Sequence, residues 1–311
     1  MWQWVDADLQ AMLEKSSVHD KPQGFRNPYL HNRELKKHME FFRRMSPPLM
    51  ATTMTALVAG LLWLFIRPLD GSFWEGMALG NAGLHPEYCE FNHMEDFVRQ
   101  PVNSWSNFCY LFLGVWLLTW GIRDGIRREK ANPIQRFPAM TIWIGLMQVG
   151  LCFGSFFFHA SLTRLGQHWD MTFTYGLGLS LAFGAAYRLV ISFGMQENIR
   201  SKAVFLSLAI ATTILFFFIK WWLNGRIALP IVMLLGVVLA VVVYVRERKQ
   251  LNSWTLLLGL IALILAAVFR SLDLAKVACE PQGLLQFHAL WHLATGVSAM
   301  IFLAFLRNEK P

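Results

Sequence analysis

The chain has 311 residues, of which 55% are hydrophobic, 14% aromatic and only 15% charged. Soluble globular proteins carry about 25% charged residues, and collagen-like or disordered chains are richer in Gly, Pro or charge. The composition therefore excludes these classes and predicts a membrane protein. The net charge of +8 would favour nucleic-acid binding only with a basic stripe on a soluble domain, and the sequence contains no such stripe.

Eight windows without Asp, Glu, Lys or Arg are long enough to cross a membrane as helices, which takes about 17–25 residues. None shows the alternation of a barrel strand, and unpaired backbone groups are costly in lipid. We therefore expect an all-α membrane protein with eight transmembrane helices. The windows are Leu49–Ile66, Trp105–Ile122, Phe137–Phe158, Met171–Tyr187, Ala203–Ile219, Ile227–Val245, Gln250–Phe269 and Pro281–Leu306.

The 28 Lys and Arg residues are unevenly divided between the two sides of these windows. The N-terminal segment, alternate loops and the tail hold 21 of them, and the other side holds 7. The positive-inside rule therefore predicts that both termini are cytoplasmic, which agrees with an even number of crossings. Residues 1–48 are expected to form a cytoplasmic basic arm and 307–311 a cytoplasmic tail, whereas the long loop 67–104 faces the other side.

Two of the four cysteines, Cys89 and Cys279, fall in loops on the non-cytoplasmic side, where a disulfide can persist. Because spacing alone does not establish geometry, a bridge and two free thiols both stay open at this point.

Three histidines lie at the non-cytoplasmic ends of the windows, where ionisable groups are costly unless they have a function or a partner. His288 and His292 are four residues apart, so they project from one face of a helix. His159 ends another window at the same level. Three imidazoles with one open position are typical of catalytic zinc. The pattern predicts a zinc site near the non-cytoplasmic face.

Two further polar residues lie at the depth of these histidines. Ser155 precedes His159 by one helical turn, and Asp170 follows a short turn after the same window. A hydroxyl can stabilise an oxyanion, and a carboxylate can carry a proton. Together with zinc they predict hydrolysis of a carbonyl compound.

A resemblance to a known family rests on three strings. They are Gly154-Ser155-Phe156-Phe157-Phe158-His159, Gly166-Gln167-His168-Trp169-Asp170 and His288-Ala289-Leu290-Trp291-His292. These strings resemble the motifs of the alkaline ceramidase family, which belongs to the wider CREST group of seven-helix membrane hydrolases. The resemblance implies that 105–306 form a seven-helix hydrolase core, to which 49–66 adds an extra N-terminal transmembrane helix.

The resemblance also implies roles for individual residues. The zinc ion would be bound by His159, His288 and His292. Asp170 would pass a proton to the leaving amine, and Ser155 would help to hold the oxyanion. The resemblance further favours the disulfide between the two loop cysteines.

Members of that family bind calcium through an acidic cluster ahead of the first core helix. This chain has Gln100 where the family has a Glu, so one formal charge is lost from a cation that prefers several carboxylates among its oxygens. Either Glu95 and Asp96 compensate or the loop is simply solvated, and calcium binding is a hypothesis. The candidate calcium ligands are Glu87, Tyr88, Glu90, Asn92 and Gln100.

These features predict a zinc-dependent integral membrane hydrolase that cleaves a linear amide in a lipid entering from the bilayer. The expected reaction is ceramidase-like release of a fatty acid from an N-acylated (sphingo)lipid. One alternative is an esterase or phospholipase that acts on a phospholipid or a GPI-type lipid. The other is a receptor-like, non-enzymatic membrane protein with structural zinc. Met171 stands where the family has a Glu, so the chain is expected to be a divergent member.

Overall fold

The computed structural model describes residues 46–126 and 132–308, and in these ranges it forms helices and no strand beyond two isolated bridges. Eight helical segments are long and apolar enough to cross a membrane, which confirms the predicted all-α class and the number of spans. Residues 1–45 of the predicted basic arm and 309–311 of the predicted tail lie outside the described part. The long helices are α3 (Pro47–Ile66), α6 (Phe108–Ile126), α7 (Pro138–Ser161), α8 (Arg164–Ser192), α9 (Ile199–Ile219), α10 (Gly225–Glu247), α11 (Ser253–Leu274) and α12 (Phe287–Arg307).

Two helices begin at other residues than the predicted windows. The last helix begins at Phe287 and not at Pro281, so His288 lies in its first turn. The fourth begins at Arg164, because the Thr163 side chain accepts a hydrogen bond from Gly166 N. The predicted window begins later in the chain, because the windows contain no charged residues and Arg164 is charged.

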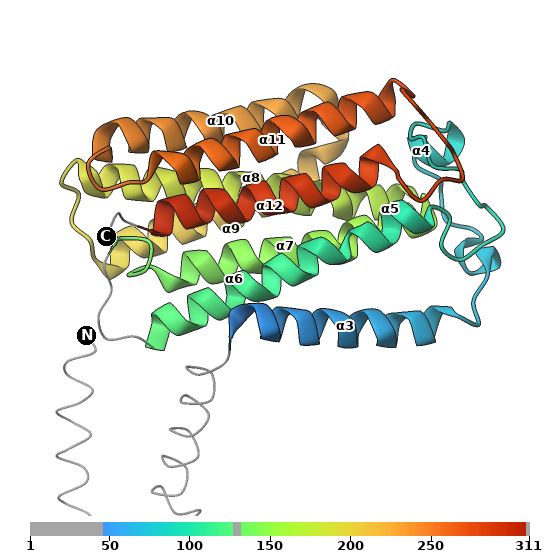
Figure 1. Cartoon of the computed structure of the whole chain (residues 1–311), viewed down its shortest axis with the longest axis horizontal. Helices are drawn as coiled ribbons and strands as arrows, with labels where there is room; N and C mark the ends of the chain where they lie inside the picture. The colour runs from blue at the N-terminus through green and yellow to red at the C-terminus, as the bar shows by residue number, and fades with distance from the viewer. Residues whose placement is uncertain (1–45, 127–131, 309–311) are drawn as a thin grey trace, which may run out of the picture. The chain divides into compact units, whose positions relative to one another are not determined.

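The second span begins with a short helix inside the predicted loop. Helix α5 (Pro101–Ser106) leads into α6, and together they make the span Pro101–Ile126. Figure 1 shows α4 (Asn81–Leu84) and the start of α5 at the end of the bundle opposite the C-terminus. Helix α7 ends, and helices α8 and α12 begin, at this same end of the bundle.

The eight spans form an inner and an outer group. In α5–α6, α7, α8 and α12 between 50 and 61% of the apolar window is buried inside the protein, whereas in α3, α9, α10 and α11 only 11 to 22% is buried. Lipid tails are as apolar as Leu, so the exposed hydrophobic side chains of the outer helices suit a bilayer. The inner helices are therefore the ones that can hold polar groups.

Two inner helices pack closely through glycine. A Cβ on Gly114 of α6 would lie 3.0 Å from the Gly145 carbonyl oxygen of α7, and a Cβ on Gly145 would lie 3.0 Å from Leu118 N. Small residues at these crossings let the two backbones approach, as in other membrane helix pairs. The close packing orients α7, which carries Ser155 and His159.

The end of the bundle near the C-terminus is held by a buried ion pair. Asp124 of α6 accepts hydrogen bonds from Arg307 Nε at 2.8 Å and from Arg307 Nη2 at 2.6 Å. Only 1% of the Asp124 surface is exposed. The pair ties α6 to the end of α12.

We expect Asp124→Ala to destabilise the protein strongly, by about 3–5 kcal/mol, because it leaves the Arg307 guanidinium buried without its counter-ion. The measurement is thermal unfolding in detergent. The double variant Asp124→Leu/Arg307→Met removes both charges and should lose much less stability. Equal losses in the single and double variants would contradict this account of the pair.

The loop between α3 and α5 is attached to the turn between α7 and α8. Gly80 N donates to the Leu162 carbonyl at 2.9 Å, and Arg164 N donates to the Ala78 carbonyl at 2.8 Å. Further along, Arg99 N and Gln100 N donate to the carbonyls of Ala160 and His159, each at 3.1 Å. The loop is thus bonded directly to the residues around His159.

Candidate metal centre and substrate cavity

Three histidine side chains from two inner helices converge at this end of the bundle. His159 is in the last turn of α7, and His288 and His292 are in the first two turns of α12. One ring nitrogen from each lies within 4.8 Å of the other two, and all three side chains are buried. The ring centroids are 4.7 to 5.2 Å apart. The structure therefore brings together the three predicted metal ligands.

The outer nitrogens of two of the three rings have hydrogen-bond partners. His159 Nδ1 is 2.7 Å from Gln100 Oε1, and His292 Nδ1 is 2.8 Å from Ser106 Oγ. Metal-binding histidines usually have such a partner on the second nitrogen, which fixes the tautomer. In these two rings Nε2 remains as the ligand atom. His288 Nδ1 lies 3.9 Å from Asp273 Oδ2 and makes no hydrogen bond within the described part of the chain. Three neutral imidazoles fit a zinc ion.

Two of the histidines, His288 and His292, line a cavity of about 1040 Å³. On α8 the cavity extends from Gln167 to Ala185, which at 1.5 Å per residue is about 27 Å along the helix. Its polar end includes Glu87, Gln167, Asp170, Lys220, Arg270 and Lys276, and its apolar part includes Leu181, Val232, Val237, Leu263, Phe302 and Leu306. One polar end and a long apolar arm suit an amphiphile with an acyl chain.

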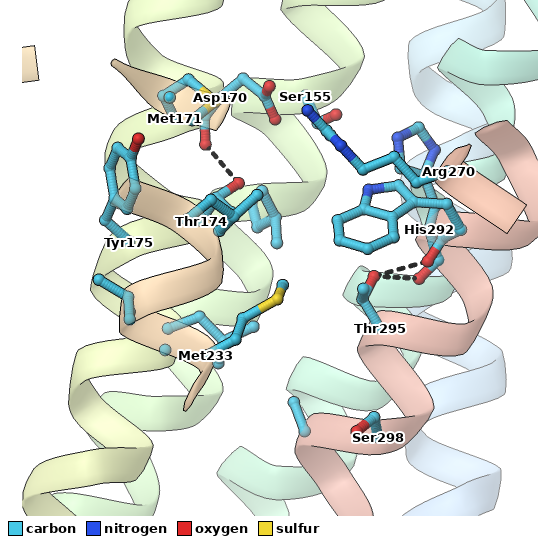
Figure 2. A pocket seen from close by; sticks show the side chains of 18 of the residues that line it. Ser155, Asp170, Met171, Thr174, Tyr175, Met233, Arg270, His292, Thr295 and Ser298 are labelled. Atoms are coloured by element: carbon cyan, nitrogen blue, oxygen red, sulfur yellow. Dashed lines mark hydrogen bonds between the residues drawn. The ribbon is translucent and has the colours of Figure 1, made fainter. Parts of the chain in front are cut away.

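The two predicted catalytic residues lie at the polar end of this cavity. Ser155 is on α7, one turn before His159, and Asp170 is in the second turn of α8. Figure 2 shows the Asp170 carboxylate directed toward Ser155, with His292 on the opposite wall. The structure thus places both side chains in the same cavity as His288 and His292.

Arg270 is a cavity residue to which sequence reasoning gave no role. Its guanidinium points into the cavity beside Ser155 and lies 5.2 Å from the Trp291 ring centroid (Figure 2). It makes no hydrogen bond or ion pair with a residue of the described part. The signal in the sequence was its position with Asp273 near the end of an otherwise apolar window.

The candidate calcium ligands do not form one open site. The Glu90 carboxylate accepts hydrogen bonds from Val102 N at 2.6 Å and Asn103 N at 2.7 Å. Burial raises the pKa of Glu90 to about 7, against the effect of these two N–H groups. Glu87 lines the cavity described above. The Tyr88 carbonyl, Asn92 Oδ1 and Gln100 Oε1 all face hydrogen-bond donors of the protein.

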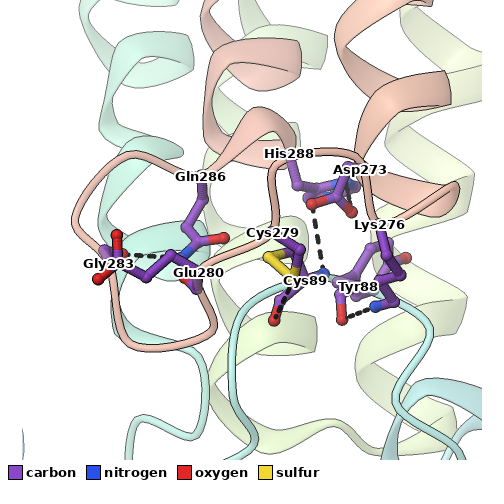
Figure 3. Close-up of a disulfide and its surroundings, with 9 residues drawn as sticks. All are labelled: Tyr88, Cys89, Asp273, Lys276, Cys279, Glu280, Gly283, Gln286 and His288. Atoms are coloured by element: carbon purple, nitrogen blue, oxygen red, sulfur yellow. Dashed lines mark hydrogen bonds and ion pairs between the residues drawn. A yellow bond between two sulfur atoms is a disulfide. The ribbon is translucent and has the colours of Figure 1, made fainter.

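Cys89 and Cys279 form a disulfide between the loop before α5 and the loop before α12. Figure 3 shows it next to Asp273, whose Oδ1 accepts a hydrogen bond from Cys89 N at 3.3 Å. The same carboxylate faces His288 Nδ1. The disulfide therefore anchors the loop whose Cys89 N–H holds the Asp273 carboxylate near His288.

We expect Cys89→Ser to lower the thermal stability in detergent, since removal of a native disulfide costs about 2–5 kcal/mol. The variant should also lose the shift in gel mobility that reduction causes in the wild-type protein. Cys152→Ser is the matched control, because Cys152 is buried and unbridged. A wild-type protein whose mobility is insensitive to reduction would count against the bridge.

The fold and this site define a multi-pass membrane protein with a buried three-histidine cluster at the polar end of a lipid-sized cavity. Comparison with protein families matches the Ceramidase family over residues 85–309, well over half of the chain. The chain belongs to the Ceramidase family, which supports a ceramidase-like hydrolase. No curated protein and no solved structure matches it.

Proposed function

We propose that this protein is a zinc-dependent hydrolase that releases a fatty acid from an N-acylated lipid by cleaving its amide bond. The observation that carries the proposal is the cluster of His159, His288 and His292 at the polar end of a cavity that also contains Asp170. The family supports amide hydrolysis, and the length of the apolar arm supports a lipid substrate.

The three histidines would hold the zinc through their Nε2 atoms. A zinc ion in such a set supplies Lewis acidity and makes water nucleophilic near neutral pH. The water oxygen forms a bond to the amide carbonyl carbon, and the Asp170 carboxylate takes a proton from the water. The Ser155 hydroxyl donates to the carbonyl oxygen as it gains negative charge. When the C–N bond breaks, Asp170 gives the proton to the leaving nitrogen.

Arg270 is suited to bind the acid that the reaction releases. Hydrolysis of an amide always leaves a carboxylate at the reacting end of the acyl chain. A guanidinium at this end of the cavity, with no ion pair or hydrogen bond to the described part of the chain, can pair with a carboxylate through two hydrogen bonds. Arg270 thus holds the acyl product at the polar end.

The acyl chain would occupy the apolar arm after entering from the bilayer between helices. Each buried methylene contributes about 0.8 kcal/mol, so chain length should dominate substrate affinity. The proposed topology keeps both termini in the cytoplasm, following the distribution of Lys and Arg. The polar end of the cavity then opens toward the non-cytoplasmic face.

A second candidate is an esterase that acts on a phospholipid or a GPI-type lipid with the same residues. The observation that favours it is a second cation at the polar end, where Lys220 lies 91% buried and its Nζ is 3.3 Å from the Trp221 ring centroid. Lys220 and Arg270 could bind a phosphate on the head group.

The test is fatty-acid release by protein purified without chelators, given ceramide, a non-sphingoid N-acyl lipid or a phospholipid in matched micelles. Zinc content is measured on the same samples. We expect about one zinc per chain and release from the amide lipids. Release from the phospholipid alone would favour the esterase. One bound zinc with no release from any lipid would favour a receptor-like protein with structural zinc.

A further inference from the structure

Gln100 lies between the metal centre and the loop where the family resemblance placed a calcium ion. Its side chain is completely buried. Its Nε2 donates to Asn92 Oδ1 at 2.7 Å, and its Oε1 is 2.7 Å from His159 Nδ1. One amide therefore connects the loop directly to a candidate zinc ligand.

The direction of these hydrogen bonds is determined by a backbone carbonyl. Asn92 Nδ2 donates to the Ala82 carbonyl at 2.9 Å, and a carbonyl can only accept. Asn92 must then present its oxygen to Gln100, so Gln100 must present its NH2 group to Asn92 and its oxygen to His159. His159 Nδ1 must carry the proton, which leaves Nε2 deprotonated and able to bind a metal.

A second donor occupies another oxygen of the candidate calcium site. The Lys276 ammonium donates to the Tyr88 carbonyl (Figure 3). Calcium takes six to eight oxygen ligands, usually with several carboxylates. Here an amide NH2 and an ammonium point at two of the oxygens that it would need, and Glu90 is bonded to the first turn of α5.

We propose that the loop site works without calcium, because the Gln100 amide and the Lys276 ammonium replace the cation, and that Gln100 is a positioning residue for His159. A glutamate at position 100 could still accept from His159, but its other oxygen would face Asn92 Oδ1. Two facing oxygens need a cation between them, whereas the glutamine amide needs none. The positioning role rests on the proposed zinc site.

The proposal that the loop works without calcium is tested by thermal unfolding of the zinc-loaded protein, with calcium chloride or in calcium-free buffer that contains no chelator. The wild-type melting temperature and hydrolysis rate should not change in either. The variant Gln100→Glu/Lys276→Ala should gain a saturable rise in melting temperature with calcium, since it has a carboxylate in place of the amide and lacks the competing ammonium. A calcium-dependent rise in the melting temperature of the wild-type protein would overturn the proposal that the loop works without calcium.

The positioning role of Gln100 is tested by the affinity of the protein for zinc, which is measured by competition with a chromophoric chelator. Loss of an outer partner of a metal ligand typically weakens metal binding by about 10–100-fold. Gln100→Leu should show that loss, and Gln100→Glu/Lys276→Ala should recover most of it in calcium, because the acceptor for His159 returns. Gln282→Leu, an exposed glutamine in the loop before α12, is the matched control.

Wild-type zinc affinity in a folded Gln100→Leu variant would overturn the positioning role. A wild-type protein that holds no zinc would remove that role together with the proposed function. The calcium response of the melting temperature depends on neither zinc nor hydrolysis, so the two proposals can fail separately.

Discussion

Asp170→Asn should lower kcat by about 10²–10⁴-fold, the usual contribution of a general acid–base group, while zinc stays bound. The asparagine side chain is nearly isosteric with the aspartate carboxylate, but it cannot take a proton from water or return one to the leaving nitrogen. Asp170 is not among the three clustered metal ligands, so zinc content should match that of the wild-type protein. The measurements are fatty-acid release under saturating substrate and elemental analysis of the same sample.

The matched control is Glu75→Gln, which neutralises an exposed carboxylate in the loop after α3. It should retain wild-type turnover. Wild-type turnover in Asp170→Asn would remove this residue from the mechanism. Loss of zinc together with turnover would instead assign Asp170 to metal binding.

His292→Ala should remove both zinc and hydrolysis. The substitution deletes one of three metal ligands. The affinity of the variant for zinc should therefore fall by more than about 100-fold, which is the largest typical effect of losing a residue that only hydrogen-bonds to a ligand. Zinc also stabilises the fold by mass action, by about 4 kcal/mol when its free concentration is 1,000 times Kd. A chelator should therefore lower the melting temperature of the wild-type protein but not that of His292→Ala.

His168→Ala is the matched control, because His168 lies against Phe217 and is outside the cluster. It should keep zinc and the response to the chelator. Restoration of the wild-type melting temperature by zinc, and not by magnesium, would identify the metal. A His292→Ala variant with full zinc content would rule out the three-histidine site.

The histidine cluster shows how far local patterns reach in a membrane chain. His288 and His292 share a face because an α-helix repeats every 3.6 residues, and that relation is readable before any tertiary structure exists. The topology placed His159 at the same level in the membrane. Depth is set by hydropathy, which is a property of each segment alone. Whether α7 and α12 lie side by side depends on both helices together, so only the tertiary structure shows it.

Gln100 shows where local patterns stop. By resemblance its position suggested a calcium ligand, yet the amide joins Asn92 to His159. Whether a glutamine oxygen faces a cation or an imidazole depends on side chains that are 8 and 59 residues away. Arg270 is similar, since its direction into the cavity beside Ser155 is visible only when the surrounding helices are in place.

The sequence by itself determined the all-α membrane class, the eight spans and the residues available for metal binding, because apolar length and helical period act within one segment. Only the tertiary structure decided the cavity, the hydrogen bonds that set the histidine tautomers and the use of the loop oxygens by protein donors. These features depend on packing between segments distant in the chain. Contacts between distant segments produce no periodic pattern of residues within either segment.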